Sequence, residues 1–523
     1  MTSQTTDSII PAGYQIERHG RLSVFAVSPS AIARVALYLH QEKRLPLMII
    51  TATDERKEQG AFKIWYIFGV PGENRFVAPY ICLADTEEFP SLAPAIHETW
   101  EYERLIQTFF GLRPVGHPHP LPLILHENWP ADAFPLRKDF HWQTRPETAH
   151  GVYPFQQVAG EGIYEIPVGP IHAGIIEPGH FRFSVAGEEI VLLEPRLGYT
   201  HKGSEKLFEE LPLPDKVRLS EKISGDSSFS HCLAFCQALE ELGSVAAPKR
   251  ALQLRVIYAE LERLANHLGD LGAIMLDAGF SFGGSQCSRL REMIMQINER
   301  LTGSRFLRGV NSIGGVTRDI GLETALPLVD ELRKIMKDFS EVMAIAENSA
   351  SLLNRLETTG TLLPKIASEH GVVGIAAKAL GIVNDARRDY PYAAYGRLYV
   401  AETFAKTGGD VYARFMARVV EVYGSIKMIQ QALAGLPAGA IKAADAEITF
   451  RKNSLALGIV EGWRGNIVYL IRTDGQGEIS RVALRDPSFL NWTLLGYAAT
   501  GCIVPDFPLI NKSMNLSYSG NDR

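Results

Sequence analysis

Two side chains that could move protons lie in a loop interrupted by glycine and proline. His172 and Glu177 belong to the segment VGPIHAGIIEPGHFRF, and His180 follows shortly after them. A loop held at both ends by strands suits general acid–base groups, because the strands fix the side chains in position. The same residues would also suit a structural turn whose polar groups face solvent, and their spacing alone does not separate the two interpretations.

A second set of polar candidates lies on the otherwise apolar pattern LANHLGDLGAIMLDAGF. It carries His267, Asp270 and Asp277. A buried carboxylate needs a partner, so without further information we expect these groups to be satisfied in the core or to face solvent.

The cysteines and one arginine complete the candidates. None of the five cysteines belongs to a C-x-x-C pair, and Cys232 and Cys236 are spaced to share one helix face. The pair could bind a soft metal, but small buried side chains are the better interpretation, and the lone His231 beside it is interpreted in the same way. Arg464, in GWRGN between two strand patterns, could offer a forked donor to an anion or be an exposed turn arginine.

The elements that position these residues begin with a mixed segment. Residues 15–142 alternate helical and strand patterns, with strands expected at 45–55 and 62–70 and a helix at 91–111. This mixture indicates a small α+β domain. Residues 1–14 are interpreted as an N-terminal tail and 143–162 as a linker.

The segment from 163 to 523 is dominated by helical patterns. A β-hairpin is predicted over 180–194, with its turn at Ala186-Gly187. Apolar residues at three- and four-residue spacing predict long helices at 226–243, 250–276, 326–356 and 410–436, followed by strands at 454–475 and 478–489. We therefore predict an α+β fold, with a small N-terminal α+β domain before a large, mainly helical domain with peripheral β-hairpin strands.

Composition excludes several classes of protein. The 53 basic and 59 acidic residues give a formal net charge of −6, which offers no electrostatic reason to bind nucleic acid. An odd and sparse set of five cysteines argues against a disulfide framework and favours a reducing compartment, and the N-terminus lacks the basic and apolar regions of a secretory signal. The longest uncharged run, between Asp486 and Asp506, is too polar for a membrane span and predicts a buried amphipathic helix.

Several segments together resemble two related families. These are the large subunit of energy-converting nickel–iron hydrogenases, of the hydrogenase-4 component G and formate hydrogenlyase type, and the fused C/D subunit of respiratory complex I. WEYERLIQTFFGLRPVGHP and PLRKDF resemble the C subunit. The D-like or hydrogenase-like segments follow in order as VGPIHAGIIEPGHFRF, LGYTHKGSEKL, RALQLRVIYAELERLANHLGDLGAIMLDAGF, NERLTGSRFLRGVNSIGGVTRD and GGDVYARFMARVVEV. The resemblance implies a C-subunit-like domain at 15–142 and a D-subunit-like, hydrogenase large-subunit-like domain at 163–523.

The resemblance does not extend to the residues that bind nickel in the related hydrogenases. Members with a nickel–iron centre hold it with two C-x-x-C pairs, because thiolates are soft ligands. The early pair falls on SGDS, with Ser224 and Ser227, and the late pair on NLSYSGNDR, with Ser517 and Gly520. A serine hydroxyl stays un-ionised at neutral pH and glycine has no side chain, so we expect no metal here. The end at Asp522-Arg523 is likewise expected to correspond to the end of complex I subunits, without the tail removed in hydrogenase maturation.

The same resemblance implies roles for the loop and helix residues. Complex I binds the quinone headgroup in the emptied cavity; His172 matches its loop histidine and Asp277 the aspartate that supports it. Glu177 resembles a hydrogenase glutamate implicated in proton movement, and Arg464 the arginine beside the metal centre. The quinone-binding tyrosine falls at Gly225 and is missing. We predict that His172, Glu177, Asp277 and Arg464 are catalytic and that the emptied cavity is lined by Ser224, Gly225, Ser227, Ser517 and Gly520.

The leading hypothesis is an oxidoreductase subunit of a membrane-associated complex. It would pass electrons from a partner iron–sulfur subunit, which carries a four-iron–four-sulfur cluster, to a quinone or similar acceptor. The complex would also contain antiporter-like membrane subunits, and this chain would lie peripherally on the cytoplasmic face of the cell membrane, reaching it through partners only. The alternatives are a structural adaptor that couples a redox module to membrane subunits, and a true nickel–iron hydrogenase, which the missing thiolates disfavour.

Overall fold

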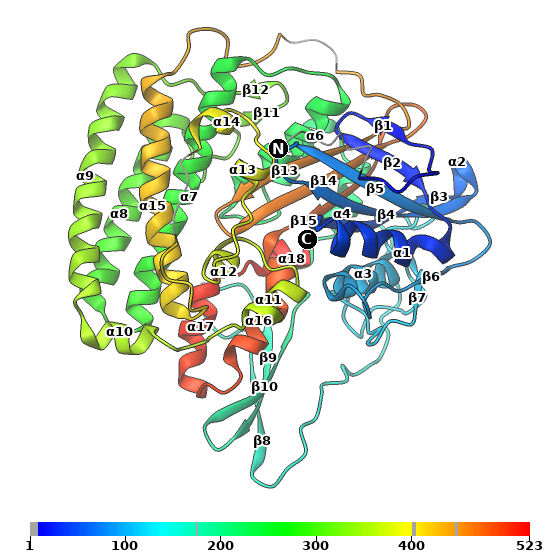
Figure 1. The fold of residues 1–523 in the computed structure, drawn as a ribbon, viewed down its shortest axis with the longest axis horizontal. Helices are drawn as coiled ribbons and strands as arrows, with labels where there is room; N and C mark the ends of the chain where they lie inside the picture. The colour runs from blue at the N-terminus through cyan, green and yellow to red at the C-terminus, as the bar shows by residue number, and fades with distance from the viewer. Residues whose placement is uncertain (1–8, 174–175, 400–403, 445–447) are drawn as a thin grey trace.

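The computed structural model describes residues 9–173, 176–399, 404–444 and 448–523. A sheet-containing N-terminal unit lies on one side of the molecule and a helix bundle on the other (Figure 1). The first eight residues of the predicted N-terminal tail, 1–14, lie outside the described residues.

The N-terminal unit is built on a five-stranded sheet. Its spatial order is β1 (Glu17–His19), β2 (Leu22–Ala26), β5 (Arg75–Leu83), β4 (Ala61–Val70) and β3 (Leu47–Glu55). Every residue of β3 and β4 is buried, and helix α3 (Trp100–Phe110) packs on β3. The strands predicted at 45–55 and 62–70 are confirmed. The unit also contains α1 (Ile32–Leu37), α2 (Arg56–Gln59) and the short paired strands β6 (Glu88–Pro90) and β7 (Arg113–Val115).

The helix predicted at 91–111 is shorter at its start. Ala95 and Ile96 both donate backbone hydrogen bonds to the Leu92 carbonyl, so the chain first makes a turn. A single 3-10 turn then leads into α3 at Trp100. The predicted end is confirmed, because Gly111 ends the helix in the left-handed conformation, at φ 70°.

The predicted β-hairpin is confirmed and belongs to a three-stranded sheet. It consists of β9 (His180–Ala186) and β10 (Glu189–Arg196), and β8 (Ile163–Val168) pairs with β9. This sheet projects from the base of the molecule in Figure 1.

The predicted long helices are present. They are α6 (Ser228–Leu242), α7 (Lys249–Asp277), α9 (Leu322–Glu347) and α15 (Val411–Ala434), with α8 (Ser281–Thr302) beside them. The pattern at 326–356 breaks in two, because α10 (Ala350–Leu356) starts a new helix capped by Ser349. Shorter helices are α4 (Ser204–Glu210), α5 (Leu213–Ser220), α11 (Pro364–Glu369), α12 (Gly374–Lys378), α13 (Ala386–Asp389) and α14 (Tyr395–Leu398), and β11 (Asn311–Ser312) pairs with β12 (Gly315–Val316).

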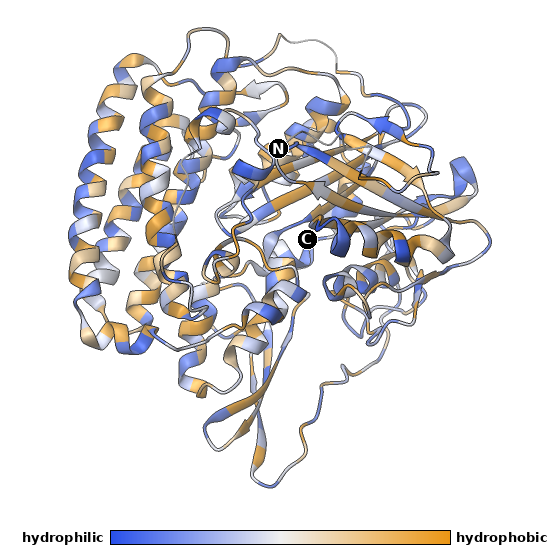
Figure 2. Cartoon of the chain, in the orientation of Figure 1, coloured by the Kyte–Doolittle hydropathy of each residue, from blue (hydrophilic) through white to orange (hydrophobic). Residues whose placement is uncertain are grey.

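The α+β class is confirmed, but the C-terminal strands predicted as peripheral lie in the middle. β13 (Leu455–Gly462), β14 (Gly465–Thr473) and β15 (Ile479–Arg485) form an antiparallel sheet that is buried almost throughout. Helix α6 packs closely on β13, since a Cβ at Gly458 would lie 1.9 Å from the Ala234 carbonyl oxygen. Figure 2 shows hydrophobic residues concentrated on this central sheet.

The C-terminal helices complete the core. α16 (Pro487–Ala499) begins at the cap Asp486, and α17 (Phe507–Met514) and α18 (Tyr518–Asp522) follow it. The buried helix predicted in the uncharged run is therefore confirmed, with only a narrow stripe at Thr493, Gly496 and Tyr497 less buried than the rest of α16. Within the described ranges, no helix is long and apolar enough to cross a membrane.

Candidate functional site

Two of the four residues that fall at the thiolate-ligand positions of the related hydrogenases contact each other directly. Ser224 precedes α6 and Ser517 caps α18, and their Oγ atoms lie 2.8 Å apart although 293 residues separate them. The Ser517 hydroxyl also accepts the Gly520 backbone N–H at 2.9 Å. Both serine side chains are buried. The start of α6 and the C-terminal helix thus form one site.

Gly225 and Ser227 follow Ser224 in the same segment before α6. Ser227 donates from its hydroxyl to Asp226 Oδ1 at 3.3 Å. Gly225 is exposed, and a Cβ built there would have only Arg308 within 4 Å, at 3.5 Å. Its backbone leaves room for a larger side chain at the position where the resemblance places a tyrosine.

Arg464 is buried rather than an exposed turn arginine. Its two Nη atoms donate to the two carboxylate oxygens of Asp226, both at 2.7 Å, and its Nε donates to the Asn515 carbonyl. The guanidinium also lies 3.9 Å from the centre of the Trp463 ring. Burial alone would raise the pKa of Asp226, but the charge and hydrogen bonds of Arg464 bring it below its usual value. Arg464 therefore ties the start of α6 to the chain entering α18.

The residues present do not fit a four-thiolate nickel–iron centre. The two serine hydroxyls are hydrogen-bonded to each other with no atom between them. A Cβ at position 520 would lie 2.6 Å from the Asp486 carboxyl group, so a ligand side chain has no space there. Across the described ranges, no group of three or more histidine, cysteine, aspartate or glutamate side chains is arranged to hold a metal ion.

The loop candidates His172 and Glu177 both contact the C-terminal helix. His172 Nε2 lies 3.4 Å from the Tyr518 hydroxyl, and Glu177 Oε2 accepts the Ser519 backbone N–H at 2.9 Å. Burial lowers the pKa of His172 and raises the pKa of Tyr518 to about 12, so at neutral pH the imidazole is uncharged and the phenol keeps its proton. His180 instead begins β9 and contacts the Gly169 carbonyl, at 3.4 Å.

Tyr518 is the functional candidate that sequence reasoning missed. It lies between the two late ligand positions, in the segment NLSYSGNDR, so the available signal was its place inside that motif. Its ring packs against Trp492, with centroids 4.7 Å apart. The resemblance places the quinone-binding tyrosine at Gly225, where this chain has none. The structure instead places the phenol of Tyr518, from α18, beside His172.

Asp277 lies apart from the histidine–tyrosine pair. It is the last residue of α7, and partial desolvation of its carboxyl by the surrounding chain raises its pKa, an effect that Lys512 partly offsets. Among the described residues it makes no hydrogen bond with His172 or Tyr518. Asp270, on the same helix, accepts from Arg418 at 2.8 Å and from the Asn515 side chain at 2.6 Å.

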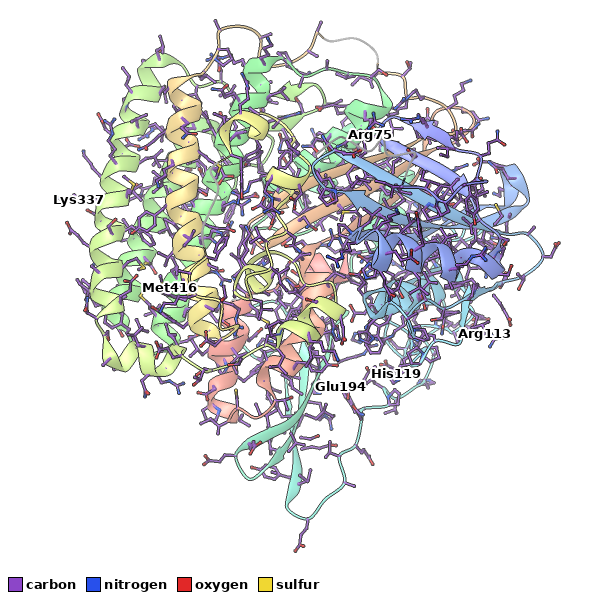
Figure 3. All side chains as sticks on the ribbon, in the orientation of Figure 1. Arg75, Arg113, His119, Glu194, Lys337 and Met416 are labelled. Atoms are coloured by element: carbon purple, nitrogen blue, oxygen red, sulfur yellow. The ribbon has the colours of Figure 1, made fainter. Side chains whose placement is uncertain are left out.

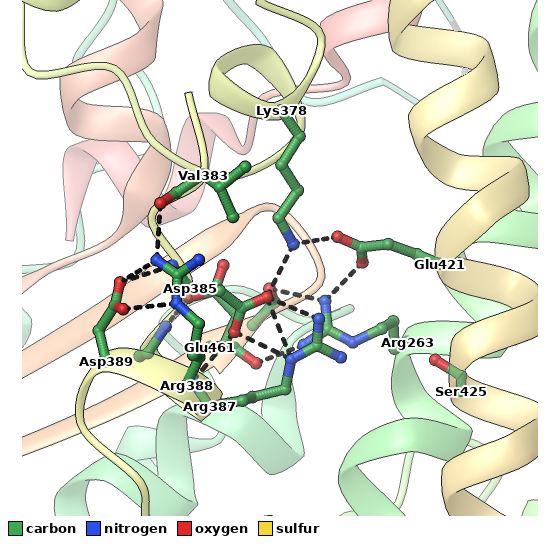
Figure 4. A network of polar contacts seen from close by, with 12 residues as sticks. Arg263, Lys378, Val383, Asp385, Arg387, Arg388, Asp389, Glu421, Ser425 and Glu461 are labelled. Atoms are coloured by element: carbon green, nitrogen blue, oxygen red, sulfur yellow. Dashed lines mark hydrogen bonds and ion pairs between the residues drawn. The ribbon is translucent and has the colours of Figure 1, made fainter. Parts of the chain in front are cut away.

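A network of buried charges surrounds the helix candidate His267. Its Nε2 lies 2.7 Å from Glu421, which also accepts from Arg263 at 2.9 Å and contacts Lys378. Figure 4 shows Glu421 held between Lys378 and Arg263. His267 is thus a buried core group paired through Nε2, while its Nδ1 has no hydrogen-bond partner among the described residues.

The region behind the serines is also polar. The fully buried His231 contacts Asp486 through Nε2 and the Tyr469 hydroxyl through Nδ1, each at 3.0 Å. Cys232 and Cys236 lie beside it with sulfurs 3.9 Å apart. The Cys232 thiol and burial raise the pKa of Cys236 well above its usual value, so it stays a thiol in the core.

Comparisons with known proteins show the family of the chain. The family profile described as the respiratory-chain NADH dehydrogenase 49 Kd subunit matches residues 277–459 and 452–523, and the 30 Kd subunit profile matches residues 25–146. Hydrogenase-4 component G of Escherichia coli (strain K12) is 35% identical over 94% of this chain and 86% of its own length. Formate hydrogenlyase subunit 5 of the same organism is 32% identical over 95% and 88%. The C/D subunit of NADH-quinone oxidoreductase from Phocaeicola vulgatus is 29% identical over 73% and 78%.

Proposed function

The chain belongs to the family that includes hydrogenase-4 component G, formate hydrogenlyase subunit 5 and the complex I-like C/D subunits, and we propose that it passes electrons from a partner iron–sulfur subunit to a quinone or similar acceptor. In this proposal the nickel–iron centre has been lost, and the acceptor is reduced beside the C-terminal helix. The observation that carries the proposal is the protic character of the site. Hydroxyls from Ser224 and Ser517 stand where thiolates would be, and His172 lies against Tyr518.

The chemistry requires protons as well as electrons. A quinone that becomes a quinol takes up two electrons and two protons, and the electrons would arrive one at a time from the cluster of the partner. Tyr518 keeps its proton at neutral pH, so its hydroxyl can hydrogen-bond to a quinone oxygen and donate the proton as that oxygen is reduced. His172, half-buried at 3.4 Å from that hydroxyl, is placed to return a proton taken from solvent.

The remaining candidate residues have positioning or electrostatic roles in this scheme. Glu177 accepts the Ser519 backbone N–H and so ties its own position in the chain to the C-terminal helix. Arg464 holds Asp226 and Asn515, and through them both sides of the serine contact. Asp277 would act at longer range, as a carboxylate at the end of α7.

The proposed partners follow from the family. A neighbouring subunit would hold the four-iron–four-sulfur cluster, and antiporter-like subunits would form the membrane part. This chain would then lie peripherally on the cytoplasmic face of the cell membrane and contact it only through those partners. The names of the relatives, which are hydrogenase components and quinone oxidoreductase subunits, support this placement.

A structural adaptor is the second candidate, and one observation favours it. The Ser224–Ser517 hydrogen bond and the forked Asp226–Arg464 pair join the walls of the site directly to each other. In that case the chain would couple a redox module to membrane subunits and bind no acceptor.

The test uses the intact complex, purified with its partners, and measures reduction of a short-chain ubiquinone analogue. We expect Tyr518→Phe to lower kcat by at least tenfold with assembly intact, since it removes one hydroxyl and keeps the ring. Tyr497→Phe, an exposed tyrosine on α16, is the matched control and should retain turnover. Full turnover in Tyr518→Phe, or no quinone-dependent turnover in the intact complex, would contradict the proposal and favour the adaptor. Stoichiometric nickel in the purified complex would also contradict it.

A further inference from the structure

A cavity of about 310 Å³ lies between the N-terminal unit and the segments that carry β10 and α16. Helix α3 forms one wall, and β10 and α16 form the others. Figure 3 labels His119 and Glu194, which both line the cavity and come from different segments of the chain. We propose that this cavity binds a small organic carboxylate with a flat, apolar body.

The carboxylate would be held by Arg104. This arginine lines the cavity and is only 6% exposed. Its Nε and Nη2 donate to the carbonyls of Leu121 and Pro122, at 2.8 and 3.2 Å, which fixes the guanidinium plane. In the part of the chain that the structure describes, no carboxylate lies within 4 Å of it. A buried guanidinium without an ion-pair partner is unfavourable, and burial lowers its pKa, so an anion of matching forked geometry would stabilise it.

The other charged groups of the cavity are already engaged. Arg196 is paired with Glu127 at 2.7 Å, and Glu194 accepts the Gln156 backbone N–H at 2.9 Å. His119 is exposed at the rim, where burial and Arg104 lower its pKa and leave it uncharged at neutral pH. Among the described residues that line the cavity, Arg104 is therefore the cation that has no carboxylate within 4 Å.

Glu101 and Glu194 both line the cavity and would oppose an anion, and the surroundings of Glu101 reduce its share of that opposition. Glu101 lies one helical turn before Arg104 and accepts a hydrogen bond from the Thr493 hydroxyl at 2.8 Å. Burial raises the pKa of its carboxyl, an effect that Arg104 offsets only in part. In its neutral form Glu101 does not repel a bound carboxylate and can donate its O–H to it.

The apolar body of the ligand would lie against aromatic and aliphatic walls. Trp100 lies beneath Arg104, with the guanidinium 5.5 Å from its ring centre, and Trp492 and Tyr497 line the cavity from α16. Leu123 and Leu192 complete the apolar lining. A volume near 300 Å³ is at the lower end of the range for small-molecule sites, which suits a compact one- or two-ring acid.

The side chain of Trp492 lies between the cavity and the candidate functional site. Trp492, which lines the cavity, donates from its indole nitrogen to the Ser517 carbonyl at 3.1 Å and packs on Tyr518. A ligand in the cavity would therefore contact the residue that supports the C-terminal helix.

The test titrates the full chain with two probes that share one ring system. Indole-3-acetate carries a carboxylate and tryptamine carries an ammonium, and each is followed by isothermal titration calorimetry at pH 6.5. We expect indole-3-acetate to bind with one-to-one stoichiometry and submillimolar affinity, and tryptamine to bind at least about tenfold more weakly. Equal affinity for the two probes, or no binding of indole-3-acetate at millimolar concentration, would overturn the proposal.

Variants then locate the site. Arg104→Gln should weaken indole-3-acetate binding by about tenfold or more. The matched control is Arg414→Gln, because Arg414 is also buried and also donates to two backbone carbonyls, of Gly409 and Gly360, but lies outside the cavity. Thr500→Trp fills the cavity from an exposed position and should abolish binding while the fold remains. Unchanged affinity in Thr500→Trp, or equal losses in the two arginine variants, would refute the assignment.

Discussion

Replacing Arg464 by glutamine should loosen the C-terminal helix more than any other part of the chain. The change removes both hydrogen bonds to Asp226 and the bond to the Asn515 carbonyl, just before α18. Losing one partner of a fully buried ion pair costs about 3–5 kcal/mol. The Asp226 side chain is 37% exposed, so solvent screens part of this, and we expect about 2 kcal/mol.

A double-mutant cycle with Asp226→Asn isolates the pair. Because each single change leaves the other group without its partner, the double variant should lose about 2 kcal/mol less than the sum of the single variants. The chain is too large for two-state unfolding, so local opening is the better measure. Hydrogen exchange followed by mass spectrometry should show peptides covering 515–523 opening about 30-fold more often in Arg464→Gln.

Two results would refute this reasoning. A coupling energy near zero would mean that the forked pair contributes nothing beyond its separate residues. Faster exchange spread over the N-terminal sheet, without a local effect at 515–523, would mean that Arg464 supports the fold in general and not the C-terminal helix.

Three further predictions test the site and its surroundings. Gly520→Cys should lower the midpoint of thermal unfolding and bind no nickel, because its Cβ would lie 2.6 Å from the Asp486 carboxyl; an unchanged midpoint would contradict this. Gly225→Tyr should leave the midpoint within about 2 °C, since its Cβ would meet only Arg308. Burial raises the pKa of Glu98 to about 8, whereas the unfolded group titrates near 4.5, so folding stability falls as pH rises between these values. Glu98→Gln should therefore become progressively more stable than the native chain from pH 5 to pH 8, and a constant difference in thermal midpoint would exclude this cause.

Local sequence patterns were sufficient to predict most of the helices and strands. The hairpin at 180–194 and the strands at 45–55 and 62–70 followed from alternation and from turn residues, which act over short distances. The central position of β13 and β14 was missed, although their sequence, LALGIVEGWRGNIVYLIRT, is a nearly continuous apolar run. Such runs are typical of strands covered on both faces, so the signal was available.

The site could be predicted only in part, because its groups come from distant segments. Nothing local in SGDS or NLSYSGNDR indicates that Ser224 and Ser517 touch, and the resemblance alone placed both at one centre. The large separation in sequence is also the reason why Tyr518 was not predicted, since its partner His172 lies 346 residues away. The local pattern did not show that Arg464 is buried, because a turn arginine is usually exposed and its partner Asp226 lies in another segment; the resemblance alone placed it at the site.

The polarity of the closed site bears on the choice between catalyst and adaptor. A buried pair of hydroxyls contributes little net stability compared with well-packed apolar side chains, because each hydroxyl gives up its hydrogen bonds with water. The forked Asp226–Arg464 pair also contributes little net stability, because the cost of removing both charges from water offsets much of their attraction. An adaptor that needed only a rigid scaffold could fill positions 224 and 517 with alanine or valine at no loss of stability. Stability alone therefore does not account for two serines, an arginine–aspartate pair and a histidine–tyrosine contact around one short helix, whereas an acceptor that must receive protons there requires groups of this kind.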